Sequence, residues 1–271
     1  MNTPLAPPPA LEPGPFGDGD LCLFIDSRRR RYLVRLQSGA TFHTHAGTLA
    51  HDEVIGRFPG MTVTTSHGLS LLALRPRPKD YVLEMRRAAQ VVYPKDYGAI
   101  LGGAGVVPGM KVLEIGLGSG SLAIATLLAI GSSGRLVSIE TRWDHAERGT
   151  ANVAGYFGTS PDNHSVIVGD ATRCLGGSAT FDACLVDIAE PWRVLAVVHC
   201  LLRPGRYVAC YSPSTTQVAR TVEEMRRQYF GAIETVEVIE RPWHIEGQSV
   251  RPQHRMVGHT GFVTVGAKLA L

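Results

Sequence analysis

The sequence has few cysteines, few aromatic residues and no long apolar run. Its five cysteines are odd in number and none has CxxC spacing, which argues against a disulfide framework and a zinc knuckle. No run reaches the roughly eighteen apolar residues that a membrane span needs. The first residues, MNTPLAPPPALEPGPF, lack the basic and apolar regions of a secretory signal. We therefore expect a cytoplasmic, globular protein with no membrane partner.

The excess of basic residues is also small. A net charge of +3 over 271 residues permits a nucleic-acid partner without requiring one. The hydrophobic content of 44% is enough for a substantial core. Length and composition are compatible with one large domain or two modest ones.

The pattern of runs and breakers predicts three regions. Residues 1–16 are rich in proline, which predicts a disordered tail. Residues 17–76 hold short strand-like runs separated by glycines, which predict a small all-β domain that ends in a proline-containing linker, RPRPKD. In residues 77–271 strand-like and helix-like runs alternate, which predicts a parallel sheet covered on both faces.

The larger domain should contain seven strands. The strand-like runs are KVLEIG, GRLVSIE, HSVIVGD, FDACLVDI, RYVACYSP, ETVEVIER and GFVTVGAKLAL. The helical runs are SLAIATLLAI, WDHAERGTANVAGYF, WRVLAVVHCLL and TTQVARTVEEMRRQYF. In the last of these, Val218, Val222, Met225 and Tyr229 recur at helical spacing and predict a buried face. The final two strands should pair as a hairpin that ends an otherwise parallel sheet.

The stretch KVLEIGLGSGS, residues 111–121, predicts a strand, a glycine loop and the start of a helix. Glycines allow a sharp turn and a close approach to a ligand, and the first helical turn offers free N–H groups. The loop lacks the third glycine spacing of a dinucleotide fingerprint and the lysine of a phosphate loop. It therefore favours a nucleotide-like ligand other than NAD or ATP.

Acidic residues end the three strands that follow the loop. Glu140, Asp170 and Asp187 close the runs GRLVSIE, HSVIVGD and FDACLVD. Because ligands bind at the carboxyl ends of parallel strands, these acids should converge on one crevice, with Glu140 placed to hold ribose hydroxyls.

Glu114 before the GxGxG loop, together with these acids, resembles the class I S-adenosylmethionine-dependent methyltransferases. Further segments resemble the tRNA adenosine-58 N1-methyltransferase family and cover nearly the whole chain: FHTHAG, HDEVIG, QVVYPKD, ETRWDHAERG, VDIAEPW and RPQHRMVGHTGF. The resemblance implies a small N-terminal β domain, a Rossmann-like seven-stranded methyltransferase domain and, in prokaryotes, a homotetramer. It also implies S-adenosylmethionine as the cofactor and N1 of adenosine 58 in the T loop of tRNA as the methyl acceptor.

The same resemblance assigns roles to individual residues. It places the cofactor against Gly116, Gly118, Ser119, Gly120, Ser121, Glu140, His145, Asp170 and Asp187. Asp187 matches the family's catalytic acid. A carboxylate that accepts a hydrogen bond from the exocyclic amine would stabilise the cation formed at N1 and could take its proton. Tyr93 and Tyr211 are expected to contact the substrate, Gln217 is a second-rank pocket candidate, and Val92 to Pro94 are expected along the cofactor.

Several other residues have two readings. His43 and His45 share one face of a strand-like run, but no third close ligand accompanies them, so we predict no metal site and consider surface or RNA contact instead. The basic groups can be solvated faces or phosphate contacts; they are Arg28 to Arg31, Arg75, Arg77, Lys79, Arg86 and Arg87. Arg251, His254 and His259 can be structural or can touch RNA. Trp192 is expected to pack rather than to face the base.

Two other functions stay open. One is a methyltransferase with another substrate, such as protein isoaspartyl carboxylates, whose domain has a similar order of strands and glycines. The other is a non-catalytic RNA-binding subunit. Degenerate glycines and the absence of Asp187 would indicate such a subunit, and the sequence has neither.

Overall fold

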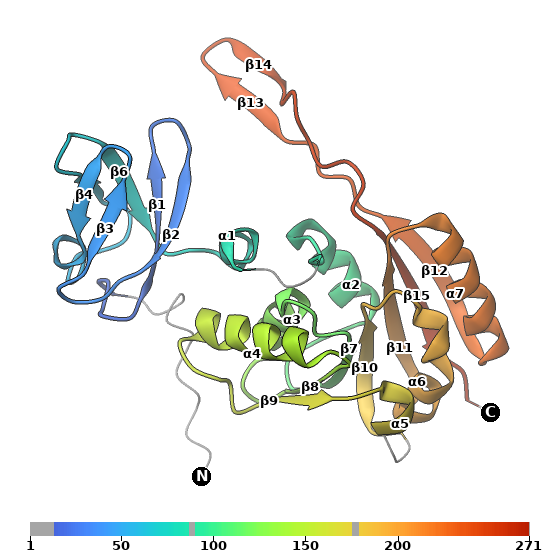
Figure 1. The fold of residues 1–271 in the computed structure, drawn as a ribbon. Coiled ribbons are helices and arrows are strands. Elements are labelled where there is room, and N and C mark those ends of the chain that lie inside the picture. Colours follow the sequence, from blue (N-terminus) through green and yellow to red (C-terminus); the bar gives the residue numbers. More distant parts are fainter. Residues whose placement is uncertain (1–13, 87–89, 175–178, 271) are drawn as a thin grey trace. The chain divides into compact units, whose positions relative to one another are not determined.

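The computed structural model of the chain describes residues 14–86, 90–174 and 179–270 (Figure 1). Most of the expected tail and Arg87 lie outside these ranges. Of the helices within them, none combines the length and apolarity that crossing a membrane requires.

The chain divides into two compact units. Of the described residues, 14–86 with 151–161 form the N-terminal unit, and 90–150 with 162–174 and 179–270 form the C-terminal unit. The N-terminal unit thus continues past residue 76, where the sequence predicts its end.

The N-terminal unit is mainly β-structure, as predicted. Its strands are β1 (Leu21–Asp26), β2 (Arg31–Arg35), β3 (Thr41–Thr44), β4 (Gly47–Ala50), β5 (Thr62–Thr64) and β6 (Ser70–Leu74). Four of them form an antiparallel sheet in the order β2-β1-β6-β5, and β3 pairs with β4. Phe16 lies in the core with Phe24 and Leu71, so the ordered unit already includes residue 16 of the expected tail.

The stretch RPRPKD is not an extended linker. Pro78 occupies the first turn of helix α1 (Pro78–Glu84), where its missing N–H costs nothing. Asp80 accepts hydrogen bonds from the backbone N–H of Arg77 at 3.0 Å and from its Nε at 2.9 Å, and Arg31 also donates to it. These bonds cap the helix and hold it within the N-terminal unit.

The C-terminal unit is built on one seven-stranded sheet in the order β12-β15-β11-β10-β7-β8-β9. Its strands are β7 (Lys111–Ile115), β8 (Arg135–Glu140), β9 (His164–Val168), β10 (Phe181–Val186), β11 (Leu202–Ser212), β12 (Phe230–Glu237) and β15 (Phe262–Lys268). The five strands from β11 to β9 run parallel, and β15 is antiparallel to β11 and β12. All residues of β10 are buried, as expected for a central strand covered on both faces. The predicted mostly parallel sheet is confirmed.

The helices of this unit are α2 (Tyr97–Gly103), α3 (Ser121–Ile130), the first half of α4 (Trp143–Phe157), α5 (Ala171–Cys174), α6 (Leu195–Leu201) and α7 (Thr215–Arg227). The second half of α4, residues 151–157, belongs to the N-terminal unit. The four predicted helical runs are all present. α6 starts later than predicted because Pro191–Arg193 (η4) first forms a 3-10 turn. The prediction for Tyr229 is wrong: α7 has ended, Tyr229 takes a left-handed φ of 56° and is 55% exposed, and the turn lets Phe230 enter the core.

The last two sheet strands pair antiparallel but are not joined by a tight turn. Residues 238–261, called the arm below, connect β12 to β15 and carry a separate hairpin of β13 (Trp243–Glu246) and β14 (Ser249–Pro252). Figure 1 shows this hairpin reaching away from the sheet. Its two short runs gave no strand signal in the sequence.

The register of the central strands sets the position of the site. Ile115 pairs with Ile139 on one side and with Val186 on the other. The residues that follow them, Gly116, Glu140 and Asp187, therefore emerge together at the carboxyl edge of the sheet.

Candidate active site

Gly116 holds the ends of three strands together. Its N–H donates to Ile139 O at 2.8 Å, and the N–H of Asp187 donates to Ile115 O at 2.9 Å. Gly116 has a φ of +97°, and a Cβ there would lie 2.1 Å from the carbonyl oxygen of Asp187. Only glycine allows this close approach of two backbones.

The loop continues through two further left-handed glycines into α3. Gly118 and Gly120 have φ of 51° and 80°, and Gly120 is the N-cap of the helix. The N–H of Gly118 donates to Glu140 Oε2 at 3.0 Å, while the N–H of Arg142 donates to Oε1 at 3.0 Å. Thr141 Oγ1 also donates to Oε1, at 3.4 Å. The carboxylate is thereby fixed, and Oε2 keeps a lone pair for a ligand hydroxyl.

Two adjoining cavities open at this edge of the sheet, with volumes of about 240 and 470 Å³. Gly116, Glu140 and Ile188 line both of them. The smaller cavity extends to Asp170, and the larger extends to Asp187. The convergence of the three strand-end acids on one crevice is thus present in the structure.

The predicted site residues divide into two groups. Those that line a cavity are Gly116, Gly118, Glu140, His145, Asp170, Asp187, Tyr211, Gln217 and Val92. Ser119, Gly120, Ser121 and Tyr93 line neither cavity. Ser119 and Ser121 are buried, and the Ser121 hydroxyl donates to Val92 O at 2.8 Å. The two serines and Gly120 therefore stabilise the loop and the start of α3 and do not line either cavity.

Three carboxyl groups crowd the centre of the site and repel one another. Asp187 is half-buried, and desolvation, with the charge of Glu140, raises its pKa to about 7. Glu114 is fully buried below the loop, and desolvation raises its pKa to about 8 although Ser138 donates a hydrogen bond to it. A cationic ligand would relieve this repulsion and favour ionised Asp187.

Asp170 has a different environment. Its Oδ1 accepts hydrogen bonds from Thr172 N at 2.9 Å and from Thr172 Oγ1 at 2.8 Å, and these bonds lower its pKa. Asp170 is therefore ionised at neutral pH and keeps Oδ2 for a donor such as an amino group.

The fit of a bound S-adenosylmethionine can be judged from these features. Glu140 lines both cavities, the acceptor Asp170 lines only the smaller one, and Asp187 lines only the larger one. A nucleoside with hydroxyls in its middle and a positive tail matches this order of chemical groups. The residues present fit the cofactor.

The sequence pattern did not single out Asp96. This carboxyl group is completely buried and accepts hydrogen bonds from Lys95 Nζ at 2.7 Å, Tyr211 Oη at 3.1 Å and Thr260 Oγ1 at 2.7 Å. In the QVVYPKD segment the sequence predicted ligand contacts for Val92 to Pro94. Its partners Tyr211 and Thr260 are distant in the chain, so no local sequence pattern marks Asp96.

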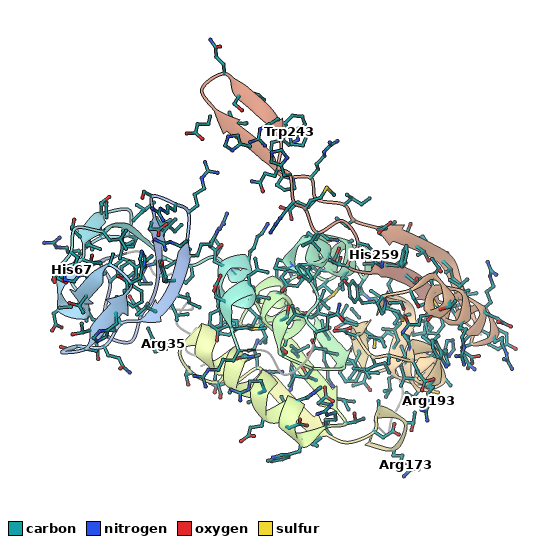
Figure 2. All side chains as sticks on the ribbon, turned by 45° about the horizontal axis from the view of Figure 1, so that its top comes forward. Arg35, His67, Arg173, Arg193, Trp243 and His259 are labelled. Carbon is teal, nitrogen blue, oxygen red and sulfur yellow. The ribbon has the colours of Figure 1, made fainter. Side chains whose placement is uncertain are left out.

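Other candidates lie outside the cavities. Trp192 is half-buried and its ring is covered by the Arg220 guanidinium, 3.9 Å from the centroid. Figure 2 shows His259 at the root of the arm and Trp243 on its hairpin. His259 contacts Glu237 Oε1 at 2.6 Å and Pro213 O at 2.9 Å, which gives it a structural role.

The N-terminal histidines do not form a cluster. His45 contacts Arg30 at 2.9 Å, and buried His51 accepts from the N–H of Gln37 at 2.9 Å. Within the described ranges, no three His, Cys, Asp or Glu side chains are arranged to hold a metal ion.

Comparisons with known proteins agree with this geometry. A family model described as the tRNA methyltransferase complex GCD14 subunit matches residues 71–259, and a TrmI-like N-terminal model matches residues 14–63. The tRNA (adenine(58)-N(1))-methyltransferase TrmI of Thermus thermophilus is 33% identical over 251 residues, covering 93% of this chain and 95% of that protein.

Two solved structures are similar over nearly the whole chain. A SAM-dependent O-methyltransferase from Thermotoga maritima has a TM-score of 0.88 and 29% identity, covering 94% of this chain and 95% of that one. The tRNA (m1A58) methyltransferase TrmI from Aquifex aeolicus has a TM-score of 0.83 and 27% identity, covering 95% and 100%. The chain belongs to the tRNA (adenine-58-N1)-methyltransferase family of class I S-adenosylmethionine-dependent methyltransferases.

Proposed function

We propose that this protein transfers a methyl group from S-adenosylmethionine to N1 of adenosine 58 in the T loop of tRNA. The observation that carries the proposal is Asp187, which lines the larger cavity beside Glu140 in a member of this family. Gly118 also lines this cavity and places no side chain over the loop.

Chain residues hold the cofactor at defined atoms. Glu140 would accept hydrogen bonds from the ribose hydroxyls, Asp170 would accept one from the adenine amino group, and His145 borders the larger cavity. When bound, S-adenosylmethionine supplies an electrophilic methyl group on a sulfonium. Ser119, Gly120 and Ser121 shape the loop and the start of α3 beneath it.

Asp187 acts on the acceptor base. Adenine N1 already carries the attacking lone pair, and methylation leaves a cation shared with the exocyclic amine. Ionised Asp187 accepts a hydrogen bond from that amine, stabilises the developing charge and can take its proton. Tyr211 borders the base, and Tyr93 follows the cavity residue Val92 in the chain. The target base must leave its stack before it can enter.

Product analysis tests the proposal. We expect unmodified tRNA incubated with enzyme and cofactor to yield N1-methyladenosine on nucleoside mass spectrometry, whereas isoaspartyl peptides stay unmodified. Asp187→Ala should lower turnover by about a thousandfold or more, because it removes transition-state stabilisation. Calorimetry should still show S-adenosylmethionine binding, since Glu140 and Asp170 remain. A 2′-O-methylated nucleoside, a methylated peptide or unchanged turnover would contradict the proposal.

We also propose a homotetramer that works in the cytoplasm with tRNA as its partner. The hairpin of the arm supports the proposal of self-assembly. A two-stranded hairpin alone is only marginally stable in water, and packing against another copy of the chain would stabilise it. Trp243, Ile245 and Val250 on this hairpin are each more than half exposed. A surface of this kind is typical of an interface between copies.

A further inference from the structure

A buried carboxyl group lies behind the wall of the larger cavity, and the chemistry proposed above does not use it. Asp96 follows Lys95 in the short 3-10 turn Pro94–Asp96 (η3) before α2. A buried carboxylate is costly unless it is paired and hydrogen-bonded, and Asp96 has three donors. These three hydrogen bonds connect Asp96 to two different parts of the C-terminal unit.

On one side Asp96 holds Tyr211. The Tyr211 hydroxyl donates a hydrogen bond to Asp96 Oδ2 at 3.1 Å. Gly261 presses on the same ring: a Cβ at Gly261 would lie 2.5 Å from Tyr211 Cζ. Tyr211 lines the larger cavity, so these contacts set the position of the cavity wall.

On the other side the same turn holds both ends of the arm. Thr260, near the end of the arm, donates to the Asp96 oxygen that also accepts from Tyr211. Lys95 donates to Asp96 and, at 2.5 Å, to the carbonyl oxygen of Val238, the first residue of the arm. Lys95 and Asp96 therefore join the two ends of the arm to one aromatic side chain of the cavity.

We propose that Asp96 is a positioning residue that fixes Tyr211 in the wall of the acceptor pocket and ties this wall to the root of the arm. The proposal rests on the function proposed above, since it assigns Tyr211 to the acceptor side. Loss of Asp96 should therefore impair methyl transfer to tRNA and leave cofactor binding intact.

The first test compares two buried carboxyl groups. Asp96→Asn should lower kcat/KM for tRNA by about tenfold to a hundredfold, the range expected for a small misplacement of a site group. Its S-adenosylmethionine affinity should stay within about threefold of wild type. Asp182→Asn is the matched control: Asp182 is also buried and accepts from Lys111 N at 2.9 Å at the opposite end of the strands. The control should keep wild-type kinetics.

A double-mutant cycle separates positioning from mere stability. If Asp96 acts through the Tyr211 hydroxyl, Tyr211→Phe and the double variant with Asp96→Asn should lose similar activity, so that the effects are not additive. Additive losses would overturn the proposal. If Asp96→Asn does not fold, Tyr211→Phe decides alone, and kcat/KM within about twofold of wild type would overturn it.

Amide hydrogen exchange provides a readout that needs no substrate. Asp96→Asn should speed exchange in peptides covering residues 236–242 and 257–263 together, with β7 and β8 unchanged. Unchanged exchange in either arm peptide would contradict the proposal that Asp96 connects the cavity wall at Tyr211 to both ends of the arm. Wild-type enzyme that leaves tRNA unmethylated would instead refute the proposed function, and the exchange experiment would still decide whether Asp96 makes the tie.

Discussion

At the scale of single residues, the site is governed by the charge of one acid. Asp187 must be ionised to accept a bond from an amine, yet desolvation and the neighbouring charge of Glu140 raise its pKa to about 7. The protonated form is neutral and cannot stabilise the developing cation. Activity should therefore depend on pH near neutrality.

The rate should rise with pH and then level off. With both substrates below saturation, we expect kcat/KM to increase about tenfold per pH unit below about 7 and to be flat above it, because this ratio reports groups of the free enzyme. Saturation with the cationic cofactor should move the break to lower pH, since a nearby positive charge favours the carboxylate. A flat profile across this break, or a rate that falls as pH rises through it, would contradict the role of Asp187.

The sequence predicted those site residues that stand at a recognisable place in a local pattern. Glu140, Asp170 and Asp187 each end a strand-like run, so their convergence followed from the fold class. Asp96 had no such signature, because its partners Tyr211 and Thr260 are far away in the chain and meet it only in three dimensions.

At the scale of elements, the joint of β7, its loop and α3 determines whether a ligand can bind. Two features exclude a side chain at Gly116: its left-handed φ and the backbone of Asp187, which an added Cβ would overlap. Gly131, which ends α3, has a similar φ of +65° but no atom within 4 Å of an added Cβ. Comparing an alanine substitution at each glycine therefore distinguishes the cost of backbone strain from the cost of steric overlap.

We expect Gly116→Ala to lower the free energy of unfolding by about 3 kcal/mol or more and to abolish cofactor binding, because an alanine adds overlap to the conformational cost. Gly131→Ala should cost about 2 kcal/mol from conformation alone, because a φ of 65° with a ψ of −171° is adopted almost only by glycine, and it should bind the cofactor normally. Urea unfolding and calorimetry on both variants provide the comparison. Equal effects at the two positions would refute the close approach of the strands.

Strong periodic runs predicted the elements well, and short runs did not. All seven strands of the large sheet and its four predicted helices are present. The hairpin of the arm was missed, since no strand was predicted between β12 and β15. Helical spacing also carried the α7 pattern too far, to Tyr229, because spacing does not show where a helix stops.

At the scale of the whole molecule, the small net charge hides an uneven distribution. In the turn between β1 and β2, Arg30 pairs with Asp26 at 2.6 Å and Arg31 pairs with Asp80. Arg28 and Arg29 in the same turn are exposed, and no carboxylate partner is present for them among the described residues. They are the members of this basic run best able to meet phosphates.

Replacing both Arg28 and Arg29 with alanine should weaken tRNA binding and lower the slope of log affinity against log salt by about 2, because each arginine would neutralise one phosphate. Arg135→Ala is a suitable control, because Arg135 starts β8 at the end of the sheet opposite the cavities. Filter binding between about 50 and 200 mM salt measures the slope, where roughly a thousandfold range is common for such proteins. An unchanged slope would remove this turn from the RNA contact surface.

The division into units was only partly visible in the sequence. The change from short strands to alternating strands and helices marked two regions, but the N-terminal unit also takes in helix α1 and residues 151–161. Such a return of the chain depends on long-range packing, which composition does not record.

The account is tested most directly by transfer of labelled methyl groups from S-adenosylmethionine to two tRNA transcripts, one with adenosine at position 58 and one with another base there. We predict label in the first transcript, recovered as N1-methyladenosine, and none above background in the second. Equal labelling of both transcripts would contradict adenosine 58 as the acceptor.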